Sequence, residues 1–300
     1  MSNFCRLCSN DRPLLQSHIL PAFVFKWKRE SSGGSHLRSS VEPNLRVQDG
    51  LKMPWLCAEC EELFSKDERG FATHLFYPFL EDSSKRYPYG SWLLRFCTSV
   101  SWRLLRLALE KNEFEDWDSE SVESCRRAEK IWREFLLGNA PHPSDHRQHL
   151  LPFDVIESST MNVAAPNINR YLTRAIQMDL CRGKTSIFTF AKLGRFAIFG
   201  TIRPDSQRWK GTAVAGNEGW IGPNKYELPG SLWNYLNEKA YDAGAALATV
   251  SEKQRGKMEQ AFAKNVHAFV GSDAFRAMQA DVEMFGNGAF ASGRPSDTAR

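Results

Sequence analysis

The sequence predicts an α+β protein that begins with a metal-bound unit and continues with a mostly helical region and a small antiparallel sheet. Two observations favour this fold class. Four cysteines form two close pairs within the first 60 residues, and β-rich runs are concentrated after residue 150, between segments with helical spacing of apolar residues. With 42% hydrophobic and 25% charged residues, the 300-residue chain has the composition of a globular protein.

The two cysteine pairs are the strongest local signal. Cys5 and Cys8 form the stretch CRLC, and Cys57 and Cys60 form CAEC. Two CxxC pairs supply four thiolates in a tetrahedral array, as in structural Zn²⁺ sites. A Ser/Gly-rich stretch at residues 30–44 accounts for much of the separation between the pairs. Unrelated thiols and a redox sensor that uses the CxxC pairs are the alternatives.

The cysteine count and the N-terminus indicate a compartment. The seven cysteines are an odd number, and the first residues show no basic segment followed by an apolar one, so we expect no secretory signal. Metal binding is then favoured over disulfides, and we expect a cytoplasmic protein. The net charge of +4 is compatible with nucleic acid but does not by itself argue for it.

The most apolar stretch, residues 92–109, contains Arg95, Arg103 and Arg106. Because charges inside a bilayer are costly, we expect a buried amphipathic helix here and no membrane partner.

The first half of the chain carries helical patterns. Apolar spacing predicts helices at 59–71, 91–111 and 119–137, the last with Ser119 as a cap. The breaker-rich stretch GNAPHPSDH at 138–146 marks a boundary. We therefore divide the chain into a zinc-binding unit at 1–80, a helical region at 81–140, an α+β domain of unknown role at 141–285 and a disordered tail at 286–300.

The α+β domain shows both helical and strand periodicity. Residues 167–180 carry apolar residues at helical spacing, and 185–202 contains two β-rich runs separated by residues 192–195, which predicts a hairpin. One or two short strands are expected within 211–229. Helices are expected at 230–248, 251–269 and 272–285, with Ser251 and Ser272 as candidate caps.

The order CRLC, SHILP and LCAECE, the last leading into a helix, resembles the HNH endonucleases of the ββα-metal, treble-clef zinc class. The resemblance covers about residues 5–70 and implies a ββα module in which the four cysteines hold a structural zinc. It also implies that His18 ends the first strand as the general base, and that Glu61 is a ligand of a catalytic Mg²⁺ or Mn²⁺. DNA is then the partner and its phosphodiester bonds the substrate. Bacterial defence against foreign DNA follows by analogy of fold alone.

The stretch departs from the family pattern at three positions. Ser17 stands where an acidic residue or a histidine usually precedes the base. The middle asparagine has no clear match, since Lys52 lies near its position and Asn44 and Asp49 lie further off. Glu61 replaces the usual final histidine or asparagine, although a carboxylate binds magnesium or manganese well. The base is therefore present, and the metal cage is altered.

Non-catalytic interpretations stand beside this one. His18 also fits an interior histidine that hydrogen-bonds the zinc-site backbone or replaces a cysteine ligand. Glu61 also fits a carboxylate stabilised by the helix dipole. The unit would then be a zinc-stabilised module that binds nucleic acid or a protein partner, or that forms a homo-oligomer. Asp67, Glu68 and His74 are additional candidate ligands if the helix orients them correctly.

Three weaker patterns remain. FVFKWKRE at 23–30 interleaves basic and aromatic residues as nucleic-acid surfaces do, but a strand with one solvent face is favoured. A basic helix face that includes Arg126 and Arg127 is expected to be only solvated. No motif after residue 150 can be tied to chemistry. PHPSDHRQH offers a second, weaker metal cluster that consists of His142, Asp145, His146 and His149.

Overall fold

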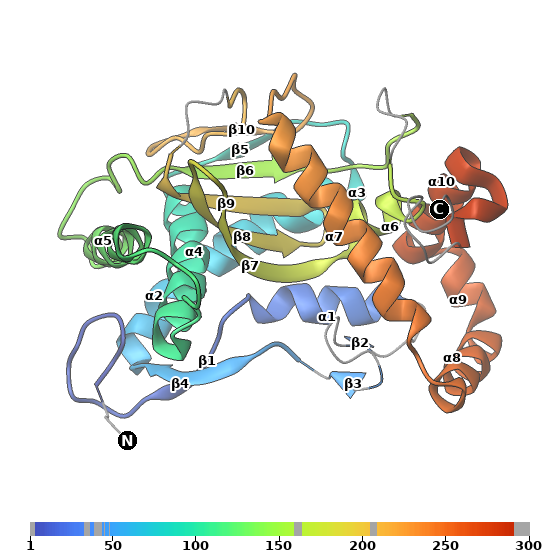
Figure 1. Ribbon diagram of the computed structural model, residues 1–300, viewed down its shortest axis with the longest axis horizontal. Helices are drawn as coiled ribbons and strands as arrows, with labels where there is room; N and C mark the ends of the chain where they lie inside the picture. The colour runs from blue at the N-terminus through green and yellow to red at the C-terminus, as the bar shows by residue number, and fades with distance from the viewer. Residues whose placement is uncertain are drawn as a thin grey trace.

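The computed structural model describes residues 4–32, 37–38, 44, 46–47, 49–158, 164–204 and 209–290. Helices and antiparallel strands are mixed along the chain, which confirms the α+β prediction (Figure 1). The first part contains β1 (Leu15–His18), α1 (Ala22–Glu30), β2 (Leu37–Arg38), β3 (Arg46–Val47), β4 (Lys52–Leu56), α2 (Ala58–Phe71), a π-helical turn (Ala72–Phe76) and α3 (Tyr77–Glu81). The middle contains β5 (Tyr87–Tyr89), α4 (Trp92–Lys111), α5 (Ser119–Leu136) and β6 (Gln148–Pro152). The remainder contains α6 (Ile168–Arg174), β7 (Ile176–Arg182), β8 (Ile187–Leu193), β9 (Phe196–Arg203), β10 (Gly219–Ile221), α7 (Gly230–Ala248), α8 (Glu252–Lys264), α9 (Val266–Val270), α10 (Asp273–Phe285) and a 3-10 helix (Gly286–Phe290).

Two strands and one helix form the N-terminal unit. β1 pairs antiparallel with β4, so that His18 lies opposite Lys52. β4 leads through Cys57 directly into α2, close to the predicted helix start at residue 59. The buried face of α2 carries Phe64 and Phe71, seven residues apart, as an amphipathic helix requires. The start of α2 and the end of β1 therefore belong to one compact unit.

The segment that follows β1 differs from the prediction. The sequence favours a strand at 23–30, but the chain forms the helix α1 there. Val24 and Trp27, three residues apart, are the buried positions of this helix. In so short a run the strand alternation and the helical spacing overlap, and the burial of Trp27 decides between them.

A four-stranded antiparallel sheet in the order β6-β9-β8-β7 lies at the centre of the molecule. The predicted hairpin consists of β8 and β9, and its turn contains Gly194, whose φ is +61°. A side chain there would collide with the ring of Trp27, because an ideal Cβ atom would lie 2.5 Å from that ring. The glycine thus allows the hairpin turn to pack directly on α1.

Helices cover both faces of this sheet. Phe190 and Phe199 share a hydrophobic cluster with Leu236 of α7. Phe196 and Ile198 belong to a second cluster, which contains the buried residues of α4. Figure 1 shows α7 crossing one face of the sheet, and α4 contacts all four strands. Because both faces are buried, β8 and β9 read in the sequence as nearly continuous apolar runs.

The prediction of a single helix at 167–180 is wrong in its second half. α6 ends at Arg174, and β7 begins at Ile176 as an edge strand. β7 pairs with β8 from Ile176 to Arg182. This pairing overrides the local helical spacing of the apolar residues.

The C-terminal helices lie close to the predicted ranges. α7 spans the predicted residues 230–248, and α8 and α9 divide the predicted helix at 251–269. Ser272 caps α10 as predicted, since its hydroxyl accepts a hydrogen bond from a backbone N–H. Ser251 makes no such side-chain bond, and Asp118 rather than Ser119 caps α5. Two of the three expected serines therefore stand at the N-cap position, and one of these two makes the capping hydrogen bond.

The tail differs from the prediction where it is described. Residues 286–290 form the short 3-10 helix instead of a disordered segment, and Ala289 is buried. Its carbonyl oxygen accepts a hydrogen bond from Arg170 of α6, which ties the segment to the fold. The rest of the expected tail, residues 291–300, lies outside the described residues.

One hydrophobic cluster joins the N-terminal unit to the rest of the molecule. It runs from Cys5 through α4 and α5 into the sheet. The ring centroids of Trp55 and Trp102 lie 6.5 Å apart, and those of Phe71 and Phe196 lie 5.3 Å apart. The cluster therefore contains residues from both sides of the boundaries expected at residues 80 and 140.

α4 is the buried amphipathic helix expected at residues 92–109. Its Arg103 is only 3% exposed and forms an ion pair with α2. Within the described ranges, no helix has both the length and the apolar character needed to span a membrane.

Candidate functional site

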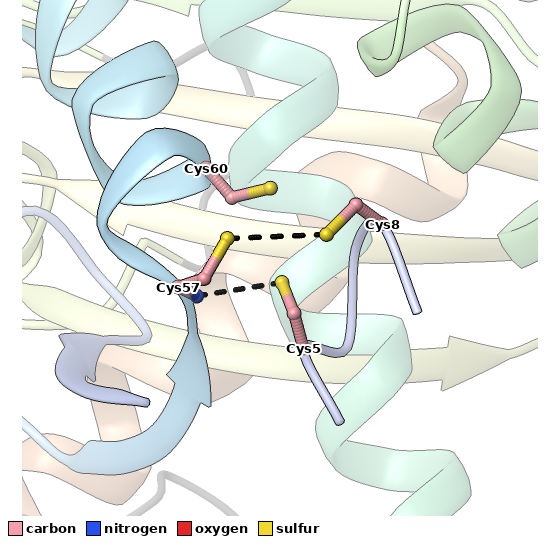
Figure 2. Close-up of side chains that lie close together, drawn as sticks. All are labelled: Cys5, Cys8, Cys57 and Cys60. Atoms are coloured by element: carbon pink, nitrogen blue, oxygen red, sulfur yellow. Dashed lines mark hydrogen bonds between the residues drawn. The ribbon is translucent and has the colours of Figure 1, made fainter. Parts of the chain in front are cut away.

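The four cysteines of the two pairs converge on one point. Their sulfur atoms all lie within 4.8 Å of one another (Figure 2). The Sγ atoms of Cys8 and Cys57 are 3.9 Å apart, which is far longer than the roughly 2.05 Å of a disulfide. A zinc ion about 2.3 Å from each sulfur requires sulfur–sulfur distances of about 3.8 Å in a tetrahedron. The arrangement therefore fits a structural metal such as zinc.

Local backbone geometry holds the four thiols together. Cys5 and Cys8 lie on a turn before β1, in which the backbone N–H of Ser9 donates to the Cys5 carbonyl oxygen at 2.9 Å. Cys57 is the residue before α2, and Cys60 lies in the first turn of that helix. The backbone N–H of Cys57 donates to the Cys5 sulfur at 3.4 Å, so the two CxxC segments also contact each other directly (Figure 2).

The electrostatics of the cluster call for a cation. Burial tends to raise the pKa of Cys5, but backbone N–H donors from Cys57, Cys8 and Leu7 outweigh it and lower that pKa to about 7. Burial, and then the negative charge of Cys5, raise the pKa of Cys60 well above its usual range. A second thiolate is thus unfavourable beside the first. A divalent cation offsets this repulsion by binding all four sulfurs as thiolates.

His18, the proposed base, lies at the end of β1 beside an acidic residue. Its Nε2 atom is 2.9 Å from the Oδ2 atom of Asp49, and its side chain is 20% exposed. The ammonium group of Lys52 lies 2.9 Å from the same carboxylate oxygen. Burial tends to raise the pKa of Asp49, but the hydrogen bonds from Lys52 and His18 outweigh it and lower that pKa to about 2. Asp49 is therefore ionised and can only accept hydrogen bonds.

The ionised carboxylate defines the tautomer of His18. Because Asp49 only accepts, the Nε2 atom must carry the proton that is shared with it. The lone pair of the neutral ring then resides on Nδ1. The backbone carbonyl of His18 is held as well, since it accepts a hydrogen bond from Arg103 at 2.7 Å. Both the ring and the strand end are thus fixed by partners outside β1.

Glu61 is brought to Ser17 rather than to His18. The Ser17 hydroxyl donates to the Oε2 atom of Glu61 at 2.7 Å. Successive side chains on a strand point to opposite faces, so Ser17 and His18 face different neighbours. Ser17 is buried and Glu61 is half-buried, directly after the metal-binding Cys60. Glu61 therefore contacts the face of β1 opposite to the one that His18 occupies.

The additional candidate ligands are occupied elsewhere. Asp67 pairs with Arg95 at 3.0 Å, and Glu68 pairs with Arg103 at 2.7 Å, so both join α2 to α4. His74 lies exposed on the π-helical turn. None of these three residues therefore contacts His18, Glu61 or the cysteine cluster in the described structure.

Three more of the sequence candidates make their hydrogen bonds away from the cysteine cluster and His18. The Asn44 side chain accepts a hydrogen bond from the backbone N–H of Ser251 at 2.9 Å. His146 and His149, from the weaker cluster, bind the Thr201 carbonyl and the Thr212 hydroxyl. Among the described residues, the four cysteines are the only group of three or more His, Cys, Asp or Glu side chains that fits a metal ion.

Asp49 is the site residue that sequence reasoning underrated. It appeared there only as a distant substitute for a metal-binding asparagine, whereas the structure makes it the direct partner of His18. One signal in the sequence was available. Asp49 lies three residues before Lys52, which begins β4, and the start of β4 lies opposite the end of β1.

Comparisons with protein-family models, with curated proteins and with solved structures gave no match.

Proposed function

We propose that the protein is a metal-dependent endonuclease of the HNH type, which hydrolyses phosphodiester bonds of DNA. His18 is the general base, Glu61 is a ligand of a catalytic Mg²⁺ or Mn²⁺, and the four cysteines hold a structural zinc. The proposal includes a cytoplasmic location and a role against foreign DNA in bacteria, which rests on the analogy of fold. The observation that carries it is the pairing of His18 with the ionised Asp49 at 2.9 Å, at the end of β1.

His18 has the chemistry that the first step needs. Its Nδ1 lone pair takes a proton from a water molecule, and the water oxygen then forms a bond to the phosphorus atom. The bond from phosphorus to the O3′ atom breaks, and the departing oxygen takes a proton from solvent. Asp49 stabilises the imidazolium that forms, since its carboxylate lies 2.9 Å from Nε2. A Mg²⁺ or Mn²⁺ ion would stabilise the charge that develops on the phosphate oxygens.

Basic side chains on β4 and on α1, the helix that follows β1, support a polyanionic substrate. Lys52, paired with Asp49, is 41% exposed, and Lys26 on the following helix is 65% exposed. Both can approach a phosphate backbone without breaking buried contacts.

A second candidate function is a zinc-stabilised module that binds nucleic acid or a protein without catalysis. The observation that favours it is the same Ser17–Glu61 hydrogen bond, because the hydroxyl already satisfies the carboxylate at the start of α2. Glu61 then stabilises the start of α2 instead of binding a metal.

Substitution of His18 separates the two functions. His18→Ala should lower Mg²⁺- or Mn²⁺-dependent cleavage of DNA on the order of 10²–10⁴-fold, with zinc content and melting temperature unchanged. His74→Ala, at an exposed histidine on the same unit, is the matched control and should cleave like the wild type. A wild-type protein that cleaves no DNA with either metal would leave the binding module as the function.

A further inference from the structure

A large cavity lies at one end of the central sheet, away from the cysteine cluster. It has a volume of about 1000 Å³ and is bounded by α5, by the ends of β7 and β9, and by the start of α7. Cavities of roughly 300–1,000 Å³ hold small-molecule ligands in proteins. None of the residues that line it belongs to the proposed nuclease site.

Aromatic rings line the inner part of this cavity. Phe199 is buried at its floor, and Phe188, Trp209 and Tyr235 are half-buried around it. The indole of Trp209 packs on the ring of His149, with centroids 4.3 Å apart and an angle of 31° between the planes. The half-buried rings therefore present flat surfaces on which a planar group can stack.

Four arginines line the same cavity, and three of them have N–H donors without a partner among the described residues. Arg127 and Arg147 are exposed and form no hydrogen bond or ion pair with a described residue. The Nε atom of Arg203 is buried and has no hydrogen-bond partner within the described ranges. Arg182 pairs with Asp118 only at 3.5 Å, on the exposed side. A buried donor without a partner is costly, so an anion that binds here would satisfy it.

The start of α7 adds a further positive feature. Pro229 and Ser231 line the cavity at the N-terminus of this 19-residue helix. The first turn of α7 contains no acidic residue, and no side chain caps it. Its free N–H groups and the helix dipole favour a negative group.

A shallower depression of about 480 Å³ extends the cavity, shares Arg182 and Arg203 with it, and adds Lys184 and Asp118. The carboxylates of Glu120 and Asp145 also line the main cavity. The positive groups outnumber them, and the depression offers room for an extended anionic chain.

We propose that this cavity binds a nucleoside phosphate, with the base against Trp209 and the neighbouring rings and the phosphates among the arginines. A neutral apolar ligand would leave the Arg203 donor unsatisfied, and a simple inorganic anion would leave the aromatic surface uncovered. A nucleoside phosphate combines the planar ring and the negative charge that the two sets of residues require. The inference does not depend on the proposed nuclease activity.

Calorimetric titration of the full-length, zinc-loaded protein with ATP and with GTP tests this proposal. At least one of them should bind with a Kd at or below about 100 μM at low salt, and adenosine or pyrophosphate alone should bind at least tenfold more weakly. Arg127→Gln and Trp209→Leu should each weaken nucleotide binding about tenfold or more. Arg126→Gln is the matched control, because this neighbouring arginine on α5 is 65% exposed and lies outside the cavity.

Several outcomes would overturn the proposal. Binding of neither nucleotide at about 1 mM would remove it, as would equal affinities of the Arg127→Gln and Arg126→Gln variants. A 5′-phosphorylated deoxythymidine 12-mer that binds at least 100-fold more tightly than ATP and GTP would assign the cavity to a nucleic-acid strand end instead. Because Arg127 is exposed, its substitution tests the cavity without a risk to folding. Nucleotide binding by the His18→Ala variant should equal that of the wild type, so failure of this inference is distinguishable from failure of the nuclease proposal.

Discussion

The guanidinium of Arg103 donates a hydrogen bond of 2.7 Å to the backbone carbonyl of His18, across 85 residues of sequence. The same guanidinium pairs with Glu68 at 2.7 Å and lies over the ring of Phe64. It is 3% exposed, so its charge is compensated by protein groups, which also include the backbone carbonyl of Ser99. α4 thereby fixes the end of β1 and the middle of α2 relative to each other.

Arg103→Met should therefore lower the free energy of unfolding by about 1–3 kcal/mol, because it leaves the half-buried Glu68 carboxylate and the His18 carbonyl without their donor. Urea denaturation measures this loss. Arg106→Met, one turn further along α4, is the control, because Arg106 is 30% exposed and pairs with Glu110 at the surface. Its loss should not exceed about 0.5 kcal/mol. Equal losses in the two variants would contradict the role of the buried network.

Removal of the metal should destabilise the whole molecule and not only its first part. Cys5, Cys57 and Cys60 belong to the same hydrophobic cluster as Trp102 of α4. A strong zinc chelator should therefore lower the melting temperature in a single cooperative transition. Two separate transitions in calorimetry would show instead that the N-terminal unit unfolds independently.

Cys57→Ser should reduce bound zinc well below one ion per chain, since a neutral hydroxyl replaces one of the four thiolates. Elemental analysis of the purified protein measures it. Cys97→Ala, at a buried cysteine of α4 outside the cluster, should keep its zinc. The assignment of a metal to the four cysteines would be wrong if the purified wild-type protein contained no zinc, or if the Cys57→Ser variant contained one zinc ion per chain.

Asp49→Asn should lower DNA cleavage on the order of 10–100-fold if His18 is the base, because the ring loses the carboxylate that orients it. His74→Ala is the control, because it leaves the Asp49–His18 bond intact. In a His18→Ala background the Asp49→Asn change should have no further effect on the rate. Additive losses in the double variant would mean that Asp49 acts independently of His18.

His149 should make stability depend on pH. Burial, and then the charge of Arg147, lower its pKa from 6.5 to about 4. The unfolded chain therefore takes up a proton near pH 6.5, whereas the folded one does so only near pH 4, so stability falls as the pH drops through this window. The loss should total about 3 kcal/mol. In urea denaturation, His149→Gln should remove this part of the pH dependence, and a wild-type stability that is constant over the window would refute it.

The features that the sequence predicted well depend on local patterns. The metal site was recognised because the two cysteines of each pair lie within one turn of backbone. The long helices α4 and α7 were recognised because their apolar periodicity extends over many turns. The hairpin β8–β9 was recognised because two β-rich runs flank a short turn with Gly194. α1 and β7 were misassigned, since a run of seven to nine residues fits either periodicity and only contacts with distant segments decide.

Contacts between distant segments were beyond the reach of sequence reasoning. Asp49 meets His18 only because β4 pairs with β1. Arg127 was expected to be merely solvated, and the sequence gives no sign that α5 places it beside Trp209 and β9 in one cavity. Such sites arise from the packing order of elements, which local patterns do not encode.

The contact between Phe71 and Phe196 has a consequence for the growing chain on the ribosome. The two rings are 5.3 Å apart in the folded protein but are separated by 125 residues of sequence. At roughly 5–20 residues per second, synthesis of that interval takes about 6–25 s. During this time the four cysteines have already been synthesised and can bind a metal. The ring of Phe71 has no contact with Phe196 until the hairpin of β8 and β9 is made. The nascent N-terminal segment therefore exposes these aromatic side chains for several seconds before the hairpin can cover them.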